Sequence, residues 1–236
     1  MTRLRVIDFE TNGIVPPSEV IEVGICDLVL GHAGWDVDEG AHGAYLHACE
    51  HLNPEVRAIH HITPAELEGT KPFLPEVLIE SALADNVSAL VAHNWTFEAQ
   101  WLGDIGNLHA LCTYKAALRV WPDAPSHSCG ALRYWLEDQG LISPEPELCQ
   151  PAHRAGPDAY VTAHILKALL ARTTGREMIA WTREPALLPR CPLGDWRGKP
   201  WSEVDAGFLR WMVNKPVKPD LVWNAKRELA RRMAAV

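Results

Sequence analysis

The feature that most constrains the fold is a short, apolar, β-rich segment that ends in two carboxylates. Residues 3–9 read Arg-Leu-Arg-Val-Ile-Asp-Phe, and Glu10 follows. On a strand, residues two apart point to the same face, so Asp8 and Glu10 would lie side by side. A buried charge is costly unless it is paired or binds a metal. The segment therefore predicts a strand that carries a charged site at its end.

The remaining signals alternate between strand and helix. Strands are expected at 3–9, 19–30, 43–47, 87–92 and 111–112, and helices at 72–84, 96–105, 113–120, 126 or 128 to 136, and 157–171. Strands followed by alternating strand and helix favour an α/β layer fold with a mixed sheet. Residues 173–191 contain Pro185 and Pro189 and are expected to be helix fragments and linker. This connector would join a domain at 1–172 to a compact basic unit at 192–236.

Charge is divided unevenly along the chain. Residues 1–171 carry 9 Lys and Arg against 23 Asp and Glu, and residues 172–236 carry 13 against 7, so −14 and +6 sum to the net charge of −8. This division fits a chain that holds metal ions in one part and attracts phosphates with another. An ordinary acidic surface with a basic terminal helix fits the charges equally well.

The composition narrows the class of protein. A hydrophobic content of 47% indicates a globular chain, and no apolar run reaches the roughly 18 residues that span a bilayer. We expect a cytoplasmic protein, because no basic-then-apolar signal opens the sequence. The six cysteines have no C-x-x-C pair and predict reduced thiols. A zinc site at His42, His47 and His51 is disfavoured, because no carboxylate pattern surrounds them.

Further acidic residues could join Asp8 and Glu10. Hydrolysis of a phosphodiester can use two divalent ions, and Mg²⁺ prefers a cluster of carboxylate oxygens. Glu98 follows the strand at 87–92, Asp158 opens an apolar helix, and His153 lies in the loop before it. Each has an ordinary alternative: Glu98 as an exposed helix residue, Asp158 as a first-turn acid favoured by the helix dipole, and His153 as a solvated loop residue.

Three segments carry a resemblance that decides between these readings. Val6-Ile-Asp-Phe-Glu-Thr11, Val91-Ala-His-Asn-Trp-Thr-Phe-Glu98 and His153-Arg-Ala-Gly-Pro-Asp158 resemble, in order and separation, the three exonuclease motifs of the DEDDh family. Ala58-Ile-His-His-Ile-Thr63 and Cys112–Pro122 extend the similarity over nearly all of residues 4–171. The resemblance implies a ribonuclease H-like fold, 3′→5′ exonuclease activity, and two Mg²⁺ or Mn²⁺ ions.

The resemblance also implies a role for each residue. Asp8 would bridge both metals, Glu10 and Asp158 would hold the nucleophile-side metal, and Glu98 would support the leaving-group side. His153 would act as general base, which suits a side chain whose ordinary pKa is about 6.5. The family normally has aspartate where this chain has Glu98. That departure could affect the level of activity and the metal preference of the enzyme. It also leaves open the alternative that the chain is a catalytically weak nucleic-acid-binding protein.

Substrate contacts are expected beside the first two motifs. In the family, backbone groups at Thr11, Asn12 and Gly13 would approach the terminal nucleotide, and Ile14 would wedge between bases. In the second motif, His93 and Asn94 are expected to orient the loop more than to bind substrate, with Asn94 retained as a candidate contact. Phe97 is expected in the core, and the candidates for stacking on bases are Trp95, Trp196 and Trp201.

The C-terminal segment narrows the predicted substrate. Residues 192–211 resemble the small C-terminal module of the exonuclease X family, which favours DNA with single-stranded or overhanging 3′ ends and release of nucleoside 5′-monophosphates. RNA trimming is the alternative within the same superfamily. The DNA backbone would contact Arg197, Lys199, Arg210 and Lys215. Docking of this unit on the acidic body and formation of a homodimer are the other interpretations.

Overall fold

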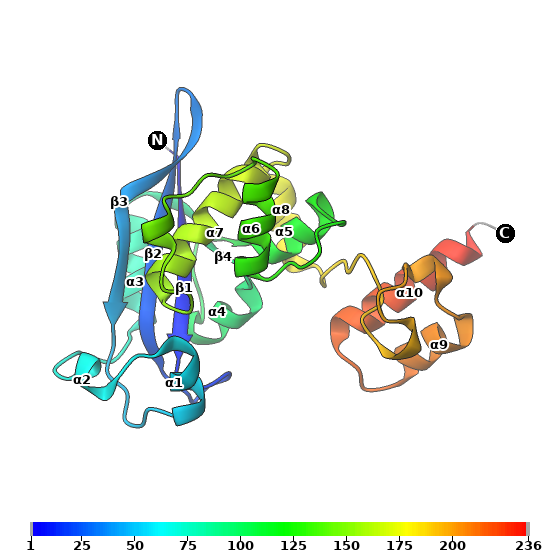
Figure 1. Cartoon of the computed structure of the whole chain (residues 1–236), viewed down its shortest axis with the longest axis horizontal. Coiled ribbons are helices and arrows are strands. Elements are labelled where there is room, and N and C mark those ends of the chain that lie inside the picture. The colour runs from blue at the N-terminus through cyan, green and yellow to red at the C-terminus, as the bar shows by residue number, and fades with distance from the viewer. Residues whose placement is uncertain (1, 235–236) are drawn as a thin grey trace.

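The structure, a computed structural model, describes residues 2–234, without the side chains of residues 39–41. Its centre is a mixed five-stranded sheet with the strand order β3-β2-β1-β4-β5 (Figure 1). The strands are β1 Arg3–Thr11, β2 Val20–Gly31, β3 Gly34–Leu46, β4 Val87–Ala92 and β5 His109–Cys112. Strands β1, β2 and β3 pair antiparallel, whereas β4 runs parallel to both β1 and β5. The expected mixed α/β sheet is confirmed, with β3 starting earlier than the predicted strand at 43–47.

Helices cover both faces of this sheet. They are α1 Pro54–His60, α2 Pro64–Leu67, α3 Pro75–Ala84, α4 Trp95–Leu102, α5 Thr113–Val120, α6 Cys129–Asp138, α7 Ala155–Leu170, α8 Gly175–Arg183, α9 Ala206–Asn214 and α10 Pro219–Met233. Leu4 and Val6 of β1 pack in one core with α7, and Ile7 and Phe9 pack in a second core with α3 and α4. This alternation follows the two-residue period of a strand and assigns Asp8 and Glu10 to the α7 face.

Four helices lie outside the ranges for which the sequence predicts helix, namely α1, α2, α9 and α10. Helices α1 and α2 are too short for a helical period to stand out, and each begins at a cap, at Asn53 and Thr63. Helix α8 falls in the connector at 173–191, for which the sequence predicts helix fragments and linker. It is a regular helix because Thr174 and Glu177 form a capping box, and Met178 is fully buried in the core of the sheet domain.

Residues beyond α8 build a second, smaller core. Helices α9 and α10 pack on each other and on the short 3₁₀ turns η2 Gly194–Trp196 and η3 Trp201–Glu203. Figure 1 shows this unit apart from the sheet domain, joined to it by an extended segment. Within residues 2–234, no helix is both long and apolar enough to cross a membrane.

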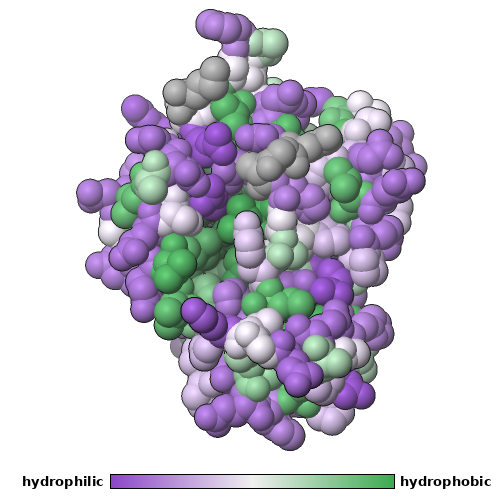
Figure 2. Space-filling view, turned by 90° about the vertical axis from the view of Figure 1, so that its left-hand side faces the viewer, coloured by the Kyte–Doolittle hydropathy of each residue, from purple (hydrophilic) through white to green (hydrophobic). Residues whose placement is uncertain are grey.

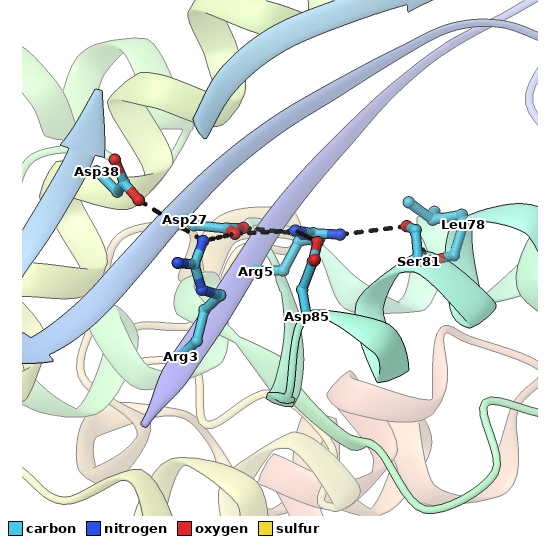
Figure 3. Close-up of polar contacts among 7 residues, drawn as sticks. All are labelled: Arg3, Arg5, Asp27, Asp38, Leu78, Ser81 and Asp85. Carbon is cyan, nitrogen blue, oxygen red and sulfur yellow. Dashed lines mark hydrogen bonds and ion pairs between the residues drawn. The ribbon is translucent and has the colours of Figure 1, made fainter. Parts of the chain in front are cut away.

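The sheet face opposite α7 is tied to α3 by a buried ion-pair network (Figure 3). Arg5 donates to Asp27 on β2, at 2.9 Å, and to Asp85 and Ser81 of the α3 region, at 2.8 and 3.2 Å. Arg3 adds a second contact to Asp27, whose side chain is fully buried. Because burial of a lone charge is costly, this full pairing gives the two arginines of β1 a structural role.

A pocket of about 690 Å³ lies on the same face, between α3 and the outer strands. Its apolar lining includes Val23, Ile25, Phe73, Leu74 and Val77. Figure 2 looks onto the side of the molecule where β3 and α3 lie and shows hydrophobic side chains gathered in a hollow. None of the residues predicted to act in catalysis or substrate binding lines this pocket.

Candidate active site

The site begins at the carboxyl end of β1, where two carboxylates leave the sheet on the α7 face. Asp8 lies directly opposite Gly24 of β2, and Glu10 lies opposite Glu22. The neighbouring strand β4 runs parallel to β1, so its carboxyl end lies at the same edge. Helix α4, which carries Glu98, follows β4 after two residues. The sheet topology alone therefore brings the first and second motifs together.

Small residues let α7 begin directly on the sheet. A Cβ atom at Gly24 would lie 1.8 Å from the carbonyl oxygen of Ala155, so only glycine fits there. A Cβ atom at Gly156 would lie 3.2 Å from that of Ala44 on β3. This close approach delivers Asp158, in the first turn of α7, to the strand end that carries Asp8.

Asp8, Glu10 and Asp158 form one cluster of half-buried carboxylates. One oxygen from each lies within 4.8 Å of the others, and this is the only such metal-binding group among the described residues. Burial and the charges of Asp158 and Glu22 raise the pKa of Glu10 to about 8. Burial, followed by the charges of Asp158, Glu98 and Glu10, also raises the pKa of Asp8. Crowded carboxylates of this kind suit a hard divalent cation.

Glu98 stands beside this cluster rather than within it. Its side chain is buried, and its Oε2 atom has no hydrogen-bond partner. Burial, followed by the charge of Glu10, raises the pKa of Glu98 to about 8. A buried carboxylate oxygen without a protein partner costs free energy, which a bound cation or its water would recover. The ordinary alternative for Glu98, an exposed helix residue, is therefore wrong.

His153 lies at the edge of the same cluster. Its backbone has a φ of +58°, in the left-handed region, and its N–H donates to Oδ2 of Asp158 at 3.2 Å. The imidazole is exposed. An L-residue enters this backbone region at a cost of roughly 1–2 kcal/mol, so the surrounding contacts must hold it there.

The comparisons with known proteins agree with this geometry. Residues 6–166 match the family model described as Exonuclease, which is more than half of the chain. The chain belongs to this exonuclease family. Together with the likeness to exonuclease X described next, the match makes it a DEDDh-type 3′→5′ exonuclease, an enzyme that acts on nucleic acids. No curated protein matches the chain.

Solved structures extend the likeness over most of the exonuclease. Exonuclease X in complex with 5′ overhanging duplex DNA is 26% identical, with a TM-score of 0.58, and the match covers 76% of this chain and 99% of that one. Cell-death related nuclease 4 is 18% identical, with a TM-score of 0.53, over 72% and 64% of the two chains. E. coli exonuclease I in complex with a dA16 oligonucleotide is 15% identical, with a TM-score of 0.52, over 77% and 43%. The last two show the fold alone.

The third motif of the exonuclease is held in place by an ion pair that the sequence did not single out, between Glu22 and Arg154. Glu22 is 1% exposed, and its carboxylate accepts from Arg154 Nη2 at 2.7 Å and from the Ala155 N–H at 2.8 Å. A signal was present, because Glu22 and Asp27 are two charges inside the otherwise apolar strand Val20–Gly31, the same kind of signal that marks Asp8.

The loop after the first motif is placed beside the cluster. The Thr11 hydroxyl donates to the Gly13 carbonyl, and the Asn12 side chain accepts from the Asn53 N–H at 2.6 Å. The Thr11 hydroxyl and the amide oxygen of Asn12 are thus engaged within the protein. Ile14 is 76% exposed, as a wedge residue has to be.

Second-motif residues divide into loop supports and exposed groups. The ring of His93 contacts the Thr113 hydroxyl at 2.9 Å and the His127 carbonyl at 2.8 Å, so it braces the loop. Asn94 is exposed, while Phe97 and Trp95 pack against the core of β1 and α3. Phe97 agrees with its prediction, whereas Trp95, a candidate for stacking, is half-buried.

The structure does not bring the basic C-terminal residues to the carboxylates. Arg197 and Lys199 are exposed on the small unit, which Figure 1 places beyond the linker from β1. The stacking prediction for Trp201 is wrong, because its ring is buried and its Nε1 donates to the Leu188 carbonyl at 2.7 Å. Trp196 is half-buried against the same core. The exposed aromatic residue there is Trp211.

Proposed function

We propose that this exonuclease hydrolyses DNA from 3′ ends by a two-metal mechanism and releases nucleoside 5′-monophosphates. The observation that carries the proposal is the cluster of Asp8, Glu10 and Asp158 within 4.8 Å, with the unpartnered oxygen of Glu98 beside it. These four side chains would hold two divalent ions. Such ions, when bound, lower the pKa of a water molecule and stabilise charge on the phosphoryl group.

His153 would take the proton of the attacking water. The oxygen of that water forms a bond to phosphorus, and the bond from phosphorus to the 3′ oxygen of the penultimate nucleotide breaks. The imidazole of His153 is exposed, and imidazole is the side chain most often used as a general base. The hydrogen bond from the His153 backbone to Asp158 would keep base and metal ligand in a fixed relation.

The small C-terminal unit would bind the nucleic-acid backbone. Residues 192–236 carry nine Lys and Arg against five Asp and Glu. Three of the acids are engaged: Asp205 caps α9, Asp220 accepts from the Ala186 N–H, and Glu228 pairs with two arginines. Arg197 and Lys199 stay exposed to attract phosphates. A DNA substrate is supported by the likeness to exonuclease X, which was solved with duplex DNA. Cytoplasmic location and a homodimer stay predictions.

A time course on labelled 3′-overhang DNA, with Mg²⁺, Mn²⁺ or a chelator, tests the proposal. We expect stepwise loss of nucleoside 5′-monophosphates from the 3′ end and no cleavage with chelator. A comparison of matched single-stranded DNA and RNA substrates shows which nucleic acid is preferred. Faster cleavage of RNA would favour the RNA-trimming alternative over a DNA substrate. Tight binding without cleavage in Mn²⁺ would contradict the proposal and favour a weak or inactive binding protein.

A further inference from the structure

The buried ion pair of Glu22 and Arg154 stands directly behind the proposed catalytic base. Glu22 lies opposite Glu10 on the neighbouring strand, so both carboxylates leave the same face of the sheet. Like charges placed opposite each other destabilise a sheet. A second buried carboxylate next to the metal-binding cluster therefore calls for a specific role, and its contacts point to one.

Every described hydrogen bond of the Glu22 carboxylate goes to the start of the third motif. Arg154 Nε lies 3.1 and 3.0 Å from the two oxygens, and Nη2 lies 2.7 Å from Oε1. The Ala155 N–H donates to Oε2 at 2.8 Å. Two parallel bonds from an arginine fix its orientation as well as its distance, and the backbone bond fixes the first residue of α7.

His153 is consequently held from both sides. On its amino side, its own N–H donates to Asp158 at 3.2 Å. On its carboxyl side, Arg154 and Ala155 are bound to Glu22. Between these anchors His153 keeps a φ of +58°, a backbone conformation that is uncommon for a residue other than glycine. Arg154 also reaches Glu66 of α2, but at 3.4 Å and at an exposed position.

We infer that Glu22 is a positioning residue of the exonuclease, which acts through Arg154 to hold the His153 backbone in the conformation used for proton transfer. The inference rests on the proposed role of His153. Glu22 would touch neither substrate nor metal, because its hydrogen-bonding oxygens face Arg154 and Ala155. Its loss would free the base and leave the ligand Asp158 on α7, where packing against Gly24 still holds the helix.

Two variants test the inference in the full-length protein. Glu22→Gln removes the charge, and Arg154→Met removes the partner from a more exposed position. We expect each to lower kcat about 10- to 100-fold with KM changed less than about threefold, because a catalytic group displaced by about 1 Å costs about 100-fold. Glu66→Gln is the matched control and should leave kcat near the wild-type value.

The His153→Ala background separates positioning from general damage. If Glu22 acts through His153, adding Glu22→Gln to His153→Ala should change kcat by less than about threefold, as expected for two residues that act as one unit. If Glu22→Gln lowers kcat as much in the His153→Ala background as it does alone, the inference is overturned. Loss of the Mg²⁺-induced rise in melting temperature in Glu22→Gln alone would also overturn it, because Glu22 would then support the metal ligand Asp158 rather than the base. So would wild-type kcat in both single variants.

Hydrogen exchange gives a readout that does not depend on cleavage. In Glu22→Gln, the amides of residues 153–155 should exchange faster, while those in the middle of α7 should not change. Unchanged exchange at 153–155 would overturn the inference even in an active enzyme. An inactive wild-type protein that shows the exchange effect would instead contradict the proposed function alone.

Discussion

In the metal-free protein, the carboxylates of Asp8 and Glu10 at the end of β1 repel those of Asp158 and Glu98. Burial is the larger cause, and burial and charge repulsion together raise the pKa of both Glu10 and Glu98 to about 8, compared with 4.5 ordinarily. A carboxylate whose pKa is raised in the folded state loses a proton more easily when unfolded. Its ionisation therefore destabilises the fold as the pH rises from about 4.5 to about 8.

This sign gives a prediction for metal-free protein. The melting temperature of the metal-free protein should fall as the pH rises from about 5 to about 8, because these two carboxylates ionise over that range. Asp8→Asn should raise the metal-free melting temperature at pH 8 by about 3 °C or more, since about 1 kcal/mol corresponds to 2–4 °C at this chain length. Mg²⁺ should stabilise the wild type more at pH 8 than at pH 6, and Asp8→Asn hardly at all. Calorimetry with and without chelator measures all three, and a flat pH profile would contradict the repulsion.

Removal of the proposed base should separate proton transfer from metal binding. His153→Ala is expected to lower kcat about 100-fold or more, within the range of general-base catalysis. The Mg²⁺-induced rise in melting temperature should stay close to that of the wild type, because no carboxylate is lost. Single-turnover cleavage of a labelled oligonucleotide gives the rate, and near-wild-type turnover would refute the assignment.

For Glu98→Asp, we expect the opposite of the gain in activity that the family resemblance suggests. The carboxylate already reaches Asp8 and Glu10 closely enough to raise pKa values in this cluster. Shortening it by one methylene in Glu98→Asp should withdraw the charge, and we expect turnover with Mg²⁺ to fall about tenfold or more. Steady-state rates with Mg²⁺ and Mn²⁺ test this, and a large gain with Mg²⁺ would show that the native glutamate handicaps the site.

At the scale of elements, the contact between α7 and β2 decides whether the third motif reaches the first. Gly24 is the position that permits this contact, because a Cβ atom there would meet the Ala155 carbonyl. Neither element supplies the site alone: β1 carries two carboxylates, and α7 carries the third, five residues after the proposed base His153. A shift of α7 away from β2 would separate them without altering any site residue.

Gly24→Ala tests the dependence on this contact. Overpacking at a closely packed site costs about 1–3 kcal/mol, so the variant should melt several degrees lower and lose activity about tenfold or more. Gly130→Ala in α6 is the matched control, since a Cβ atom there meets nothing within 4 Å. The control should keep its activity and gain a little stability from the higher helix propensity of alanine. Equal behaviour of the two variants would remove α7 docking as the deciding contact.

At the scale of the whole molecule, an acidic domain that would hold metal is joined to a basic unit with its own core. The likeness to exonuclease X covers 76% of this chain, and the family match ends at residue 166. The unit from residue 192 lies outside that match. Its separate core of Cys191, Leu209, Met212 and Ala225 indicates that it can be altered without disturbing the sheet.

Truncation after residue 185 should therefore weaken DNA binding without affecting hydrolysis at the active site. The shortened chain keeps α8 and is expected to hydrolyse a small nucleotide ester at the wild-type rate, but to bind single-stranded DNA weakly and with a smaller dependence on salt. In the full chain, Arg197→Ala with Lys199→Ala should reduce the salt slope by about 0.7 per lost phosphate contact. Fluorescence anisotropy in Ca²⁺ measures binding and its salt dependence, and release of product from the nucleotide ester in Mg²⁺ measures hydrolysis. Unchanged binding would favour docking or dimerisation as the role of the unit.

The sequence by itself determined the chemistry offered to the site and the mixed sheet that carries it. Asp8 and Glu10 were recognisable because a strand period places them on one face and an apolar strand has no ordinary use for charge. The order of three motifs then added Glu98, His153 and Asp158. These signals are local, and local spacing is what a linear sequence preserves.

Only the tertiary structure decided which residues hold the motifs together. Glu22 and Arg154 lie 132 positions apart, and no period or spacing relates them until β2 and α7 pack. The same packing explains why Gly24 has to be glycine and why the side chain of Glu98 is buried rather than solvated. Contacts between distant segments depend on how helices settle on the sheet, and that is a property of the assembled core rather than of any one segment.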